Sequence, residues 1–287
     1  MSDTSFGDRL SVVFASLGHL CVGIDPHASV LDLWGFPDTA EGARSFGLSV
    51  VDGVSGVSGI VKPQVAFFER FGSKGFQALE YVITAARDRG ILVIADAKRG
   101  DIDTSVAAYA QAWLSPGSPL ESDALTLSPF QGVGSLRGPL ESAEQAGKGV
   151  FVLAATSNPQ ARDVQLSMAS TGPHTGLTIS RSILEDIQEF NRQQPHHSFG
   201  TAGVVLGATL NLTEFGIDTS TSSTPIVPVL APGFGHQGAQ IDQVRALYGA
   251  LTPGVIVSES RGVLNAGPDS FVSSVRQRVE EIERAYA

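Results

Sequence analysis

The chain has 287 residues, of which 42% are hydrophobic and 17% are charged, and its formal net charge is −10. This composition is sufficient for a large core, and the length suits one α/β barrel or two small domains. The acidic balance argues against a nucleic-acid partner, whereas an anionic small molecule fits, because a few local cations outweigh distant charge inside a cleft.

The N-terminus and the cysteine content indicate the compartment. Residues 1–10 lack the apolar segment of a signal peptide, and no apolar run approaches the ~18 residues that a transmembrane helix needs. The single cysteine, Cys21, excludes an internal disulfide, and its apolar neighbours are typical of a packed core thiol rather than a nucleophile. We therefore expect a cytoplasmic protein with no membrane contact.

Short apolar runs alternate with longer amphipathic segments along the chain. The apolar runs predict strands over residues 19–25, 59–65, 91–97, 123–128, 149–155, 202–208, 226–231 and 254–259. Helical patterns lie between them, such as Phe68–Arg89, Thr104–Leu114, Leu136–Ala146, Thr178–Gln193, Ala239–Leu247 and Asp269–Tyr286. Eight strands, mostly each followed by a helix, predict a single-domain (β/α)8 TIM barrel over residues 1–287, with an open doubly wound sheet as the alternative.

The segment 157–176 is long for a connection between a strand and a helix. A lid over a site and a variable insertion are both compatible with it, and the sequence leaves both open.

The third predicted strand is the most informative part of the chain. Residues 91–95 are apolar and largely β-branched, and four charged residues then follow within six positions. Side chains on a strand alternate with period two, so Asp96 and Lys98 point to the same side. Chemistry in α/β proteins lies at the carboxyl ends of strands. The plain alternative is a structural ion pair that closes the strand, because charges beside a core are costly unless they are paired.

Polar or glycine-rich residues also follow other predicted strands. They are Asp25-Pro26, Lys62-Pro63-Gln64, Thr156–Pro159, Ala231–Gly238 and Ser258–Gly262. Because these strand ends share one face of a parallel barrel, we expect an active site at that face.

Taken together, these segments resemble the orotidine 5′-phosphate decarboxylase family in its longer bacterial form. The block 96–102 is similar to the family pattern D-x-K-x-x-D-I, and Lys62, the Pro-Gly-x-Gly-x-Gln loop at 232–237 and Ser-Arg-Gly at 260–262 occur in the family's order. The resemblance spans about residues 19 to 265. It implies decarboxylation of orotidine 5′-monophosphate to UMP and CO2, the last step of de novo UMP synthesis, with no cofactor and no metal ion.

The chemistry of that reaction suits a lysine. Loss of CO2 leaves a carbanion at C6 of the pyrimidine, and a fixed cation beside C6 both stabilises this charge and donates the replacing proton. We assign this role to Lys98, with Asp96 and Asp101 keeping it charged and Lys62 completing an alternating array. The resemblance further implies that Asp101 and Ile102 reach into the neighbouring subunit's site, so that the working unit is a homodimer.

The resemblance also implies residues that bind the ribose and the base. Asp25 corresponds to the acceptor of a ribose hydroxyl, although it could be a turn residue before Pro26. Ser105 falls where the family usually has a threonine that contacts ribose. Ser157 corresponds to the residue that contacts the pyrimidine edge, although an ordinary Ser-Asn-Pro turn is equally compatible with the sequence.

The loop 233–238 satisfies the pattern G-x-G-x-x-G, but it follows the seventh strand, and no acidic ribose partner lies about 20 residues further on. A phosphate site therefore fits better than a dinucleotide fold, because glycines let backbone N–H groups approach a phosphate. Arg261 would add a bidentate cation, unless it forms a surface salt bridge. The resemblance implies that these loops bind substrate through Pro232, Gly233, Gln237, Ser260 and Arg261, with Gln237 between phosphate and base.

Two other functions stay open. A Mg²⁺-dependent sugar-phosphate lyase would need a further acidic ligand near the third strand, for which Glu259 is only a remote candidate. A binding protein that has lost the chemistry would need a broken catalytic set. The histidines show no metal-ligand spacing: we expect His27 and His236 near the mouth of the barrel, and His174, His196 and His197 in solvent.

Overall fold

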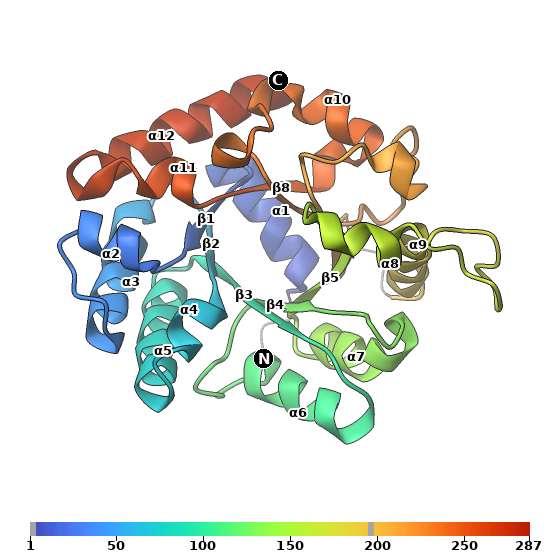
Figure 1. The fold of residues 1–287 in the computed structure, drawn as a ribbon, viewed down its shortest axis with the longest axis horizontal. Helices are drawn as coiled ribbons and strands as arrows, with labels where there is room; N and C mark the ends of the chain where they lie inside the picture. The colour runs from blue at the N-terminus through green and yellow to red at the C-terminus, as the bar shows by residue number, and fades with distance from the viewer. Residues whose placement is uncertain (1–3, 195–197) are drawn as a thin grey trace.

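The computed structural model describes residues 4–194 and 198–287, and its centre is a closed barrel of eight parallel strands in chain order (Figure 1). The strands are β1 (Leu20–Ile24), β2 (Ile60–Pro63), β3 (Leu92–Arg99), β4 (Ala124–Leu127), β5 (Gly149–Ala155), β6 (Ala202–Leu206), β7 (Val229–Pro232) and β8 (Val255–Glu259). The last strand pairs with the first, in the register Cys21 with Ser258, which closes the sheet. The predicted TIM barrel is thus confirmed, and the open sheet is excluded.

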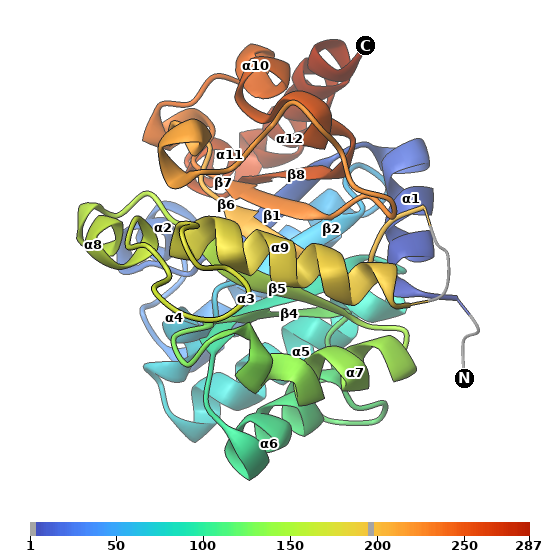
Figure 2. The same ribbon diagram turned by 90° about the vertical axis from the view of Figure 1, so that its right-hand side faces the viewer.

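Helices cover the outer face of the barrel and one of its ends (Figures 1 and 2). They are α1 (Phe6–Leu17), α2 (Ala28–Leu33), α3 (Ala40–Val54), α4 (Val65–Glu69), α5 (Ser73–Asp88), α6 (Asp103–Leu114), α7 (Arg137–Gln145), α8 (Arg162–Gln165), α9 (Ile179–Arg192), α10 (Val244–Tyr248), α11 (Arg261–Leu264) and α12 (Gly267–Tyr286). Short 3-10 helices occupy Val133–Leu136, Pro159–Ala161, Leu212–Phe215, Gly235–Gln237, Ile241–Gln243 and Gly249–Gly254.

Two predicted helices differ from the structure. The helix predicted over Phe68–Arg89 is divided into α4 and α5, because Gly72 between them has a φ of +63°. The helix predicted over Ala239–Leu247 begins as the 3-10 turn Ile241–Gln243, and only α10 is α-helical.

Helix α1 closes the N-terminal end of the barrel, as Figure 2 shows. Its apolar residues Phe6, Leu10 and Val13 belong to one cluster with side chains of the barrel interior, including Cys21 and Phe151. Burial raises the pKa of Cys21 to about 12, so its thiol stays protonated, as expected for a packed core residue.

A buried ion cluster fixes α1 at this end. Arg9 of α1 pairs with Asp123, which precedes β4 and accepts a hydrogen bond from the Val93 amide at 2.9 Å. Lys148, which precedes β5, pairs with Glu121 at 2.7 Å. These four charged side chains pair with one another at the end of the barrel where the strands begin, so we interpret the cluster as structural.

The segment 157–176 forms a short 3-10 helix and α8, followed by a loop that projects outward (Figure 1). An isolated bridge between Met168 and Thr178 closes the base of this loop. His174 is an exception to the expected solvated histidines, because it is partly buried and its Nε2 lies 2.6 Å from Asp186 Oδ1. His196 and His197 lie outside the described residues. Within the described chain, no helix is long and apolar enough to cross a membrane.

Candidate active site

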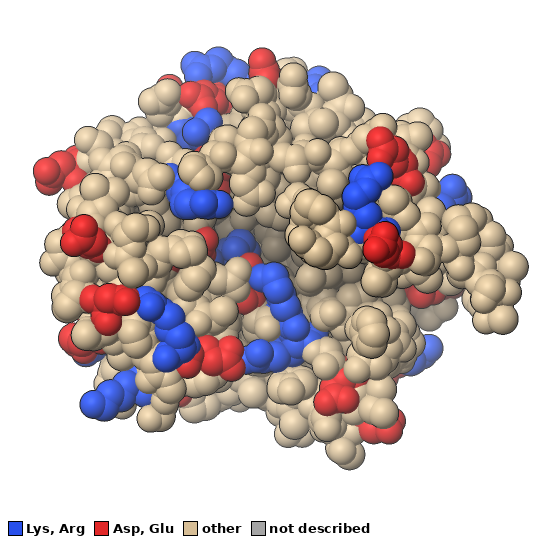
Figure 3. All heavy atoms as spheres, viewed as in Figure 1, with Lys and Arg blue, Asp and Glu red and all other residues tan. Residues whose placement is uncertain are grey.

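A cavity of about 350 Å³ opens at the carboxyl ends of the barrel strands. Figure 3 shows this face hollowed near its centre, with lysine and arginine side chains in and around the hollow. Seven barrel strands or the residues directly after them contribute to the lining. Its charged or titratable members are Asp25, His27, Lys62, Asp96, Lys98, His236, Glu259 and Arg261.

Asp96 stands at the centre of a charged array in this cavity. Its Oδ2 lies 2.9 Å from Lys62 Nζ, and its Oδ1 lies 2.6 Å from Lys98 Nζ. Lys62 comes from β2, while Asp96 and Lys98 come from the same side of β3, as the period-two argument predicted. Lys62 and Asp96 are buried, but Lys98 has 45% of its side chain exposed. One ammonium group is therefore enclosed, and the other faces the open cavity.

Burial and charge act in opposite directions on these groups. Burial by itself would lower the pKa of Lys62, but the Asp96 and Asp25 carboxylates outweigh it and raise this pKa. Burial would likewise raise the pKa of Asp96, but the ammonium groups of Lys62 and Lys98 lower it well below its usual range. Lys62 and Asp96 are therefore both charged at neutral pH.

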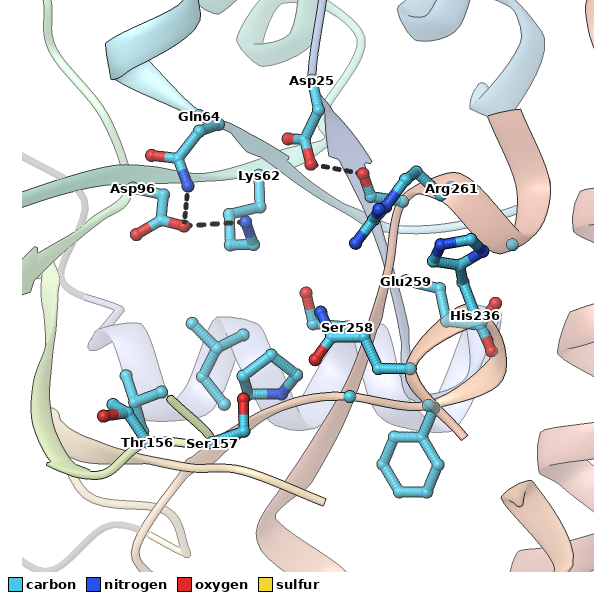
Figure 4. Close-up of a pocket in the computed structure, with 18 of the residues that line it drawn as sticks. Asp25, Lys62, Gln64, Asp96, Thr156, Ser157, His236, Ser258, Glu259 and Arg261 are labelled. Carbon is cyan, nitrogen blue, oxygen red and sulfur yellow. Dashed lines mark hydrogen bonds and ion pairs between the residues drawn. The ribbon is translucent and has the colours of Figure 1, made fainter. Parts of the chain in front are cut away.

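Two uncharged side chains complete the array. Gln64 donates from Nε2 to Asp96 Oδ2 at 3.0 Å, and its Oε1 accepts from Lys98 Nζ at 3.4 Å (Figure 4). The Thr126 hydroxyl of β4 donates to Asp96 Oδ1 at 3.0 Å. Gln64 belongs to the polar segment that we predicted after the second strand, but we assigned no role to it, and we did not predict Thr126. Period two places Gln64 on the same side of the strand as Lys62.

The backbone around Lys98 is irregular. The pairing of β3 with β4 shifts register between Ala95 and Arg99, and Lys98 has a φ of +50°. A non-glycine residue in this left-handed region costs of order 1–3 kcal/mol, and such residues cluster at functional sites. The Lys98 amide donates to Thr126 Oγ1 at 2.9 Å, which holds this conformation in place.

The opposite wall of the cavity comes from β1 and β8. The Ser260 hydroxyl donates to Asp25 Oδ2 (Figure 4). Asp25 Oδ1 is buried and has no hydrogen-bond partner within residues 4–194 and 198–287. The two strands approach closely here: a Cβ atom on Gly23 would lie 2.7 Å from Ser260 Cβ. The unpartnered oxygen of Asp25 is consequently available to a ligand hydroxyl.

The glycine-rich loop after β7 forms the rim beside Arg261. Gly233 and Gly238 have φ values of +116° and +109°, a backbone conformation that residues with a Cβ rarely adopt. His236 and Gln237 from this loop line the cavity, and Figure 4 shows His236 beside Arg261. Glycines next to a cation are well suited to bind an anionic group.

Most of the predicted site residues lie together in this cavity. They are Asp25, Lys62, Asp96, Lys98, Ser157, Pro232, Gly233, Gln237, Ser260 and Arg261. His27 and His236 also line it, as expected for the mouth of the barrel.

Asp101, Ile102 and Ser105 do not line the cavity of their own chain. They lie beyond the end of β3 and in the first turns of α6, where Ile102 is 51% exposed. Asp101 Oδ1 accepts a hydrogen bond from the Ile102 amide at 2.8 Å. Within one chain, the structure therefore does not bring these three residues to the charged array.

The side chains that the structure describes form no evident metal site. Within residues 4–194 and 198–287, no group of three or more histidine, cysteine, aspartate and glutamate side chains could hold a metal ion. Glu259 ion-pairs with Arg278 at 3.1 Å and belongs to no such group among the described residues.

A TIM barrel with paired lysine and aspartate side chains in a cavity at its strand ends has the architecture of an enzyme for a small anionic molecule. Residues 18–272 match the model of the family "Orotidine 5′-phosphate decarboxylase / HUMPS". The chain belongs to this family.

Curated relatives and a solved structure agree with the family match. An orotidine 5′-phosphate decarboxylase from Corynebacterium efficiens is 45% identical over 280 residues, which cover 96% of this chain and 95% of the relative. One from Salinispora tropica is 44% identical over 265 residues, covering 92% and 91%. The structure of a candidate orotidine 5′-phosphate decarboxylase from Streptomyces avermitilis has a TM-score of 0.91 at 42% identity, covering 99% of this chain and 97% of the other.

Proposed function

We propose that this chain decarboxylates orotidine 5′-monophosphate to UMP and CO2 without a cofactor. The observation that carries the proposal is the array of Lys62, Asp96 and Lys98 inside the cavity of a member of this family. The sugar-phosphate lyase has no support in these relatives, which are named decarboxylases. The binding protein is disfavoured because the array is intact.

The proposed reaction places the substrate carboxylate at the array. The bond between C6 and the carboxylate breaks, CO2 leaves, and the electron pair stays on C6. The Lys98 ammonium stabilises this pair and then donates its proton to C6, which yields UMP, and solvent returns a proton to the amine. Asp96 pairs with the Lys98 ammonium and orients it through the contact at 2.6 Å.

The remaining lining residues position the substrate. We assign Asp25 to a ribose hydroxyl because its buried Oδ1 lacks a partner. The phosphate binds at Gly233, Gln237 and Arg261, and the nearby residues Pro232 and Ser260 shape the same loops. Ser157, on the opposite side of the cavity in Figure 4, contacts the base.

We further propose a homodimer in which Asp101 and Ile102 reach the partner's site. Two facts support it: neither residue lines its own cavity, and the apolar Ile102 is half-exposed at the rim of the barrel. Ser105 would contact ribose from the same segment. We place the enzyme in the cytoplasm, where a reducing environment suits its buried thiol Cys21.

Product analysis tests the proposed function. The protein, pretreated with EDTA, is incubated with orotidine 5′-monophosphate, and the nucleotides are separated by chromatography. We expect UMP in an amount equal to the substrate consumed. Substrate that stays intact, together with turnover of a sugar phosphate only after Mg²⁺ is added, would replace the decarboxylase by the lyase.

A further inference from the structure

Glu259, the last residue of β8, is a buried carboxyl group that the proposed reaction does not use. Its side chain is fully buried, yet it contributes to the wall of the cavity. Neither of its carboxyl oxygens has a hydrogen-bond partner among the residues that the structure describes. Figure 4 shows Glu259 beside Arg261 and His236, on the wall to which we assign the substrate's phosphate.

The carboxyl group of Glu259 packs against both loops of the proposed phosphate site. A Cβ atom on Gly262 would lie 2.3 Å from Glu259 Oε2, and one on Gly235 would lie 2.9 Å from the same oxygen. The carboxyl oxygen therefore fills the space beside both glycines. A phosphate held by these loops would be close to it.

Among the described residues, Arg278 is the one cation that makes an ion pair with Glu259, and it is shared with a second carboxylate. Arg278 Nε lies 3.1 Å from Glu259 Oε1, and Nη1 of the same guanidinium donates to Glu281 Oε2 at 2.6 Å. If Glu259 and Glu281 were both ionised, Arg278 would neutralise only one of them, and an uncompensated negative charge is costly at a buried position. Burial raises the pKa of Glu259, Arg278 lowers it and Glu281 raises it, with a net increase.

We infer that Glu259 takes up a proton when the substrate's phosphate binds and thereby couples phosphate affinity to pH. This inference rests on the proposed function. An ionised Glu259 repels the phosphate dianion, whereas the neutral acid does not. Affinity is therefore constant while Glu259 is already protonated in the free enzyme. At higher pH, where Glu259 is ionised in the free enzyme but still protonated in the complex, the affinity falls by up to about tenfold per pH unit.

Calorimetric titration with UMP over a range of pH tests this coupling in the wild type, Glu259→Gln and Glu281→Gln. Glu259→Gln should remove the fall in affinity at rising pH that the wild type shows. Glu281→Gln is the matched control: it frees Arg278 for Glu259, so the fall should begin at a lower pH. The second ionisation of UMP's own phosphate, at about pH 6, is common to all three proteins.

A second measurement is independent of the folding of Glu259→Gln. In a His236→Asn background, which removes the neighbouring imidazole, UMP binding is measured above about pH 7 in two buffers with different ionisation enthalpies. We expect proton uptake with UMP and none with uridine, which lacks the phosphate. An absence of proton uptake in the pH range where the wild-type affinity falls, or identical pH profiles of wild type and Glu259→Gln, would overturn the inference alone. No UMP binding at any pH would overturn the proposed function and the inference with it.

Discussion

At the scale of single residues, the pair Asp96 and Lys98 was predictable, whereas its contact with Thr126 was not. Period two along a strand requires only the sequence, and it correctly places both side chains in one cavity. Thr126 contacts them from β4 at a register that no local pattern encodes. The positive φ of Lys98 was also not predictable, because it depends on the shift in pairing between β3 and β4.

Replacement of Arg261 tests the phosphate site. Hydrogen bonds to a charged group contribute about 1.5–3 kcal/mol, so Arg261→Ala should raise the Michaelis constant for orotidine 5′-monophosphate by about 10- to 100-fold. Steady-state kinetics measures this constant. Arg89→Ala, which removes an exposed arginine paired with Asp52, is the matched control and should leave it unchanged. An unaltered Michaelis constant in Arg261→Ala would contradict the assignment of Arg261 to the phosphate.

The array also predicts how stability depends on pH. The pKa of Asp96 is lower in the folded state, so its contribution is present above its unfolded pKa of about 4 and is lost as pH falls through the folded pKa. Asp96→Asn should therefore be less stable than the wild type at neutral pH, and the difference should shrink on acidification below about pH 4.

Urea denaturation at a series of pH values measures this difference. In the control Asp52→Asn, which breaks only an exposed ion pair, stability should change by less than about 1 kcal/mol throughout. A difference for Asp96→Asn that stays constant down to low pH would show that the charge of Asp96 does not stabilise the fold. The contribution of Lys62 to stability depends on pH in the opposite direction. The pKa of Lys62 is raised in the folded state, so this contribution is present below about pH 10.4 and is lost as pH rises through the folded pKa.

At the scale of elements, the strands were predictable because each is a compact apolar run, whereas α1, α2 and α3 were not among the helices that we named. Helix α1 buries Phe6, Leu10 and Val13 against the barrel end, a surface that exists only once the barrel has closed. A local signal was nevertheless present, since Ser5 caps the helix by accepting a hydrogen bond from the Asp8 amide at 3.0 Å.

Helix α1 should stabilise the barrel from the end opposite to the site. Leu10 is completely buried, so Leu10→Ala should lower the free energy of unfolding by about 2–5 kcal/mol. Val12 on the same helix is 66% exposed, and Val12→Ala should change stability by about 0.5 kcal/mol or less. Chemical denaturation compares the two variants. Equal effects would mean that the contact of α1 with the barrel contributes little to the fold.

At the scale of the whole molecule, the closed barrel brings residues from distant parts of the sequence to one cavity. Asp25 and Ser260, which bond across its wall, are 235 positions apart. Topology alone placed these residues together, since parallel strands of one barrel end at the same face. The sequence of one chain cannot show which residues a second chain supplies, so the proposed roles of Asp101 and Ile102 in a partner's site rest on the family resemblance.

Mixing two inactive variants tests the proposed dimer. If Asp101 acts in the partner's site, a hybrid dimer of Lys98→Ala and Asp101→Asn chains contains one site with both native residues. Equal mixtures should then regain activity at about a quarter of all sites, whereas each variant alone stays inactive. Activity is assayed after the chains have exchanged. No recovery, with hybrid dimers shown to form, would place Asp101 in its own subunit's site or remove it from the reaction.

The most direct test of the central claim follows the ultraviolet absorbance of orotidine 5′-monophosphate with the wild type and with Lys98→Ala. The wild type should abolish the orotate band as UMP forms. Lys98→Ala should leave the band unchanged while still binding UMP, because the ammonium that stabilises and protonates C6 is gone but the phosphate site remains. Turnover by Lys98→Ala at the wild-type rate would contradict the claim that this lysine carries out the decarboxylation.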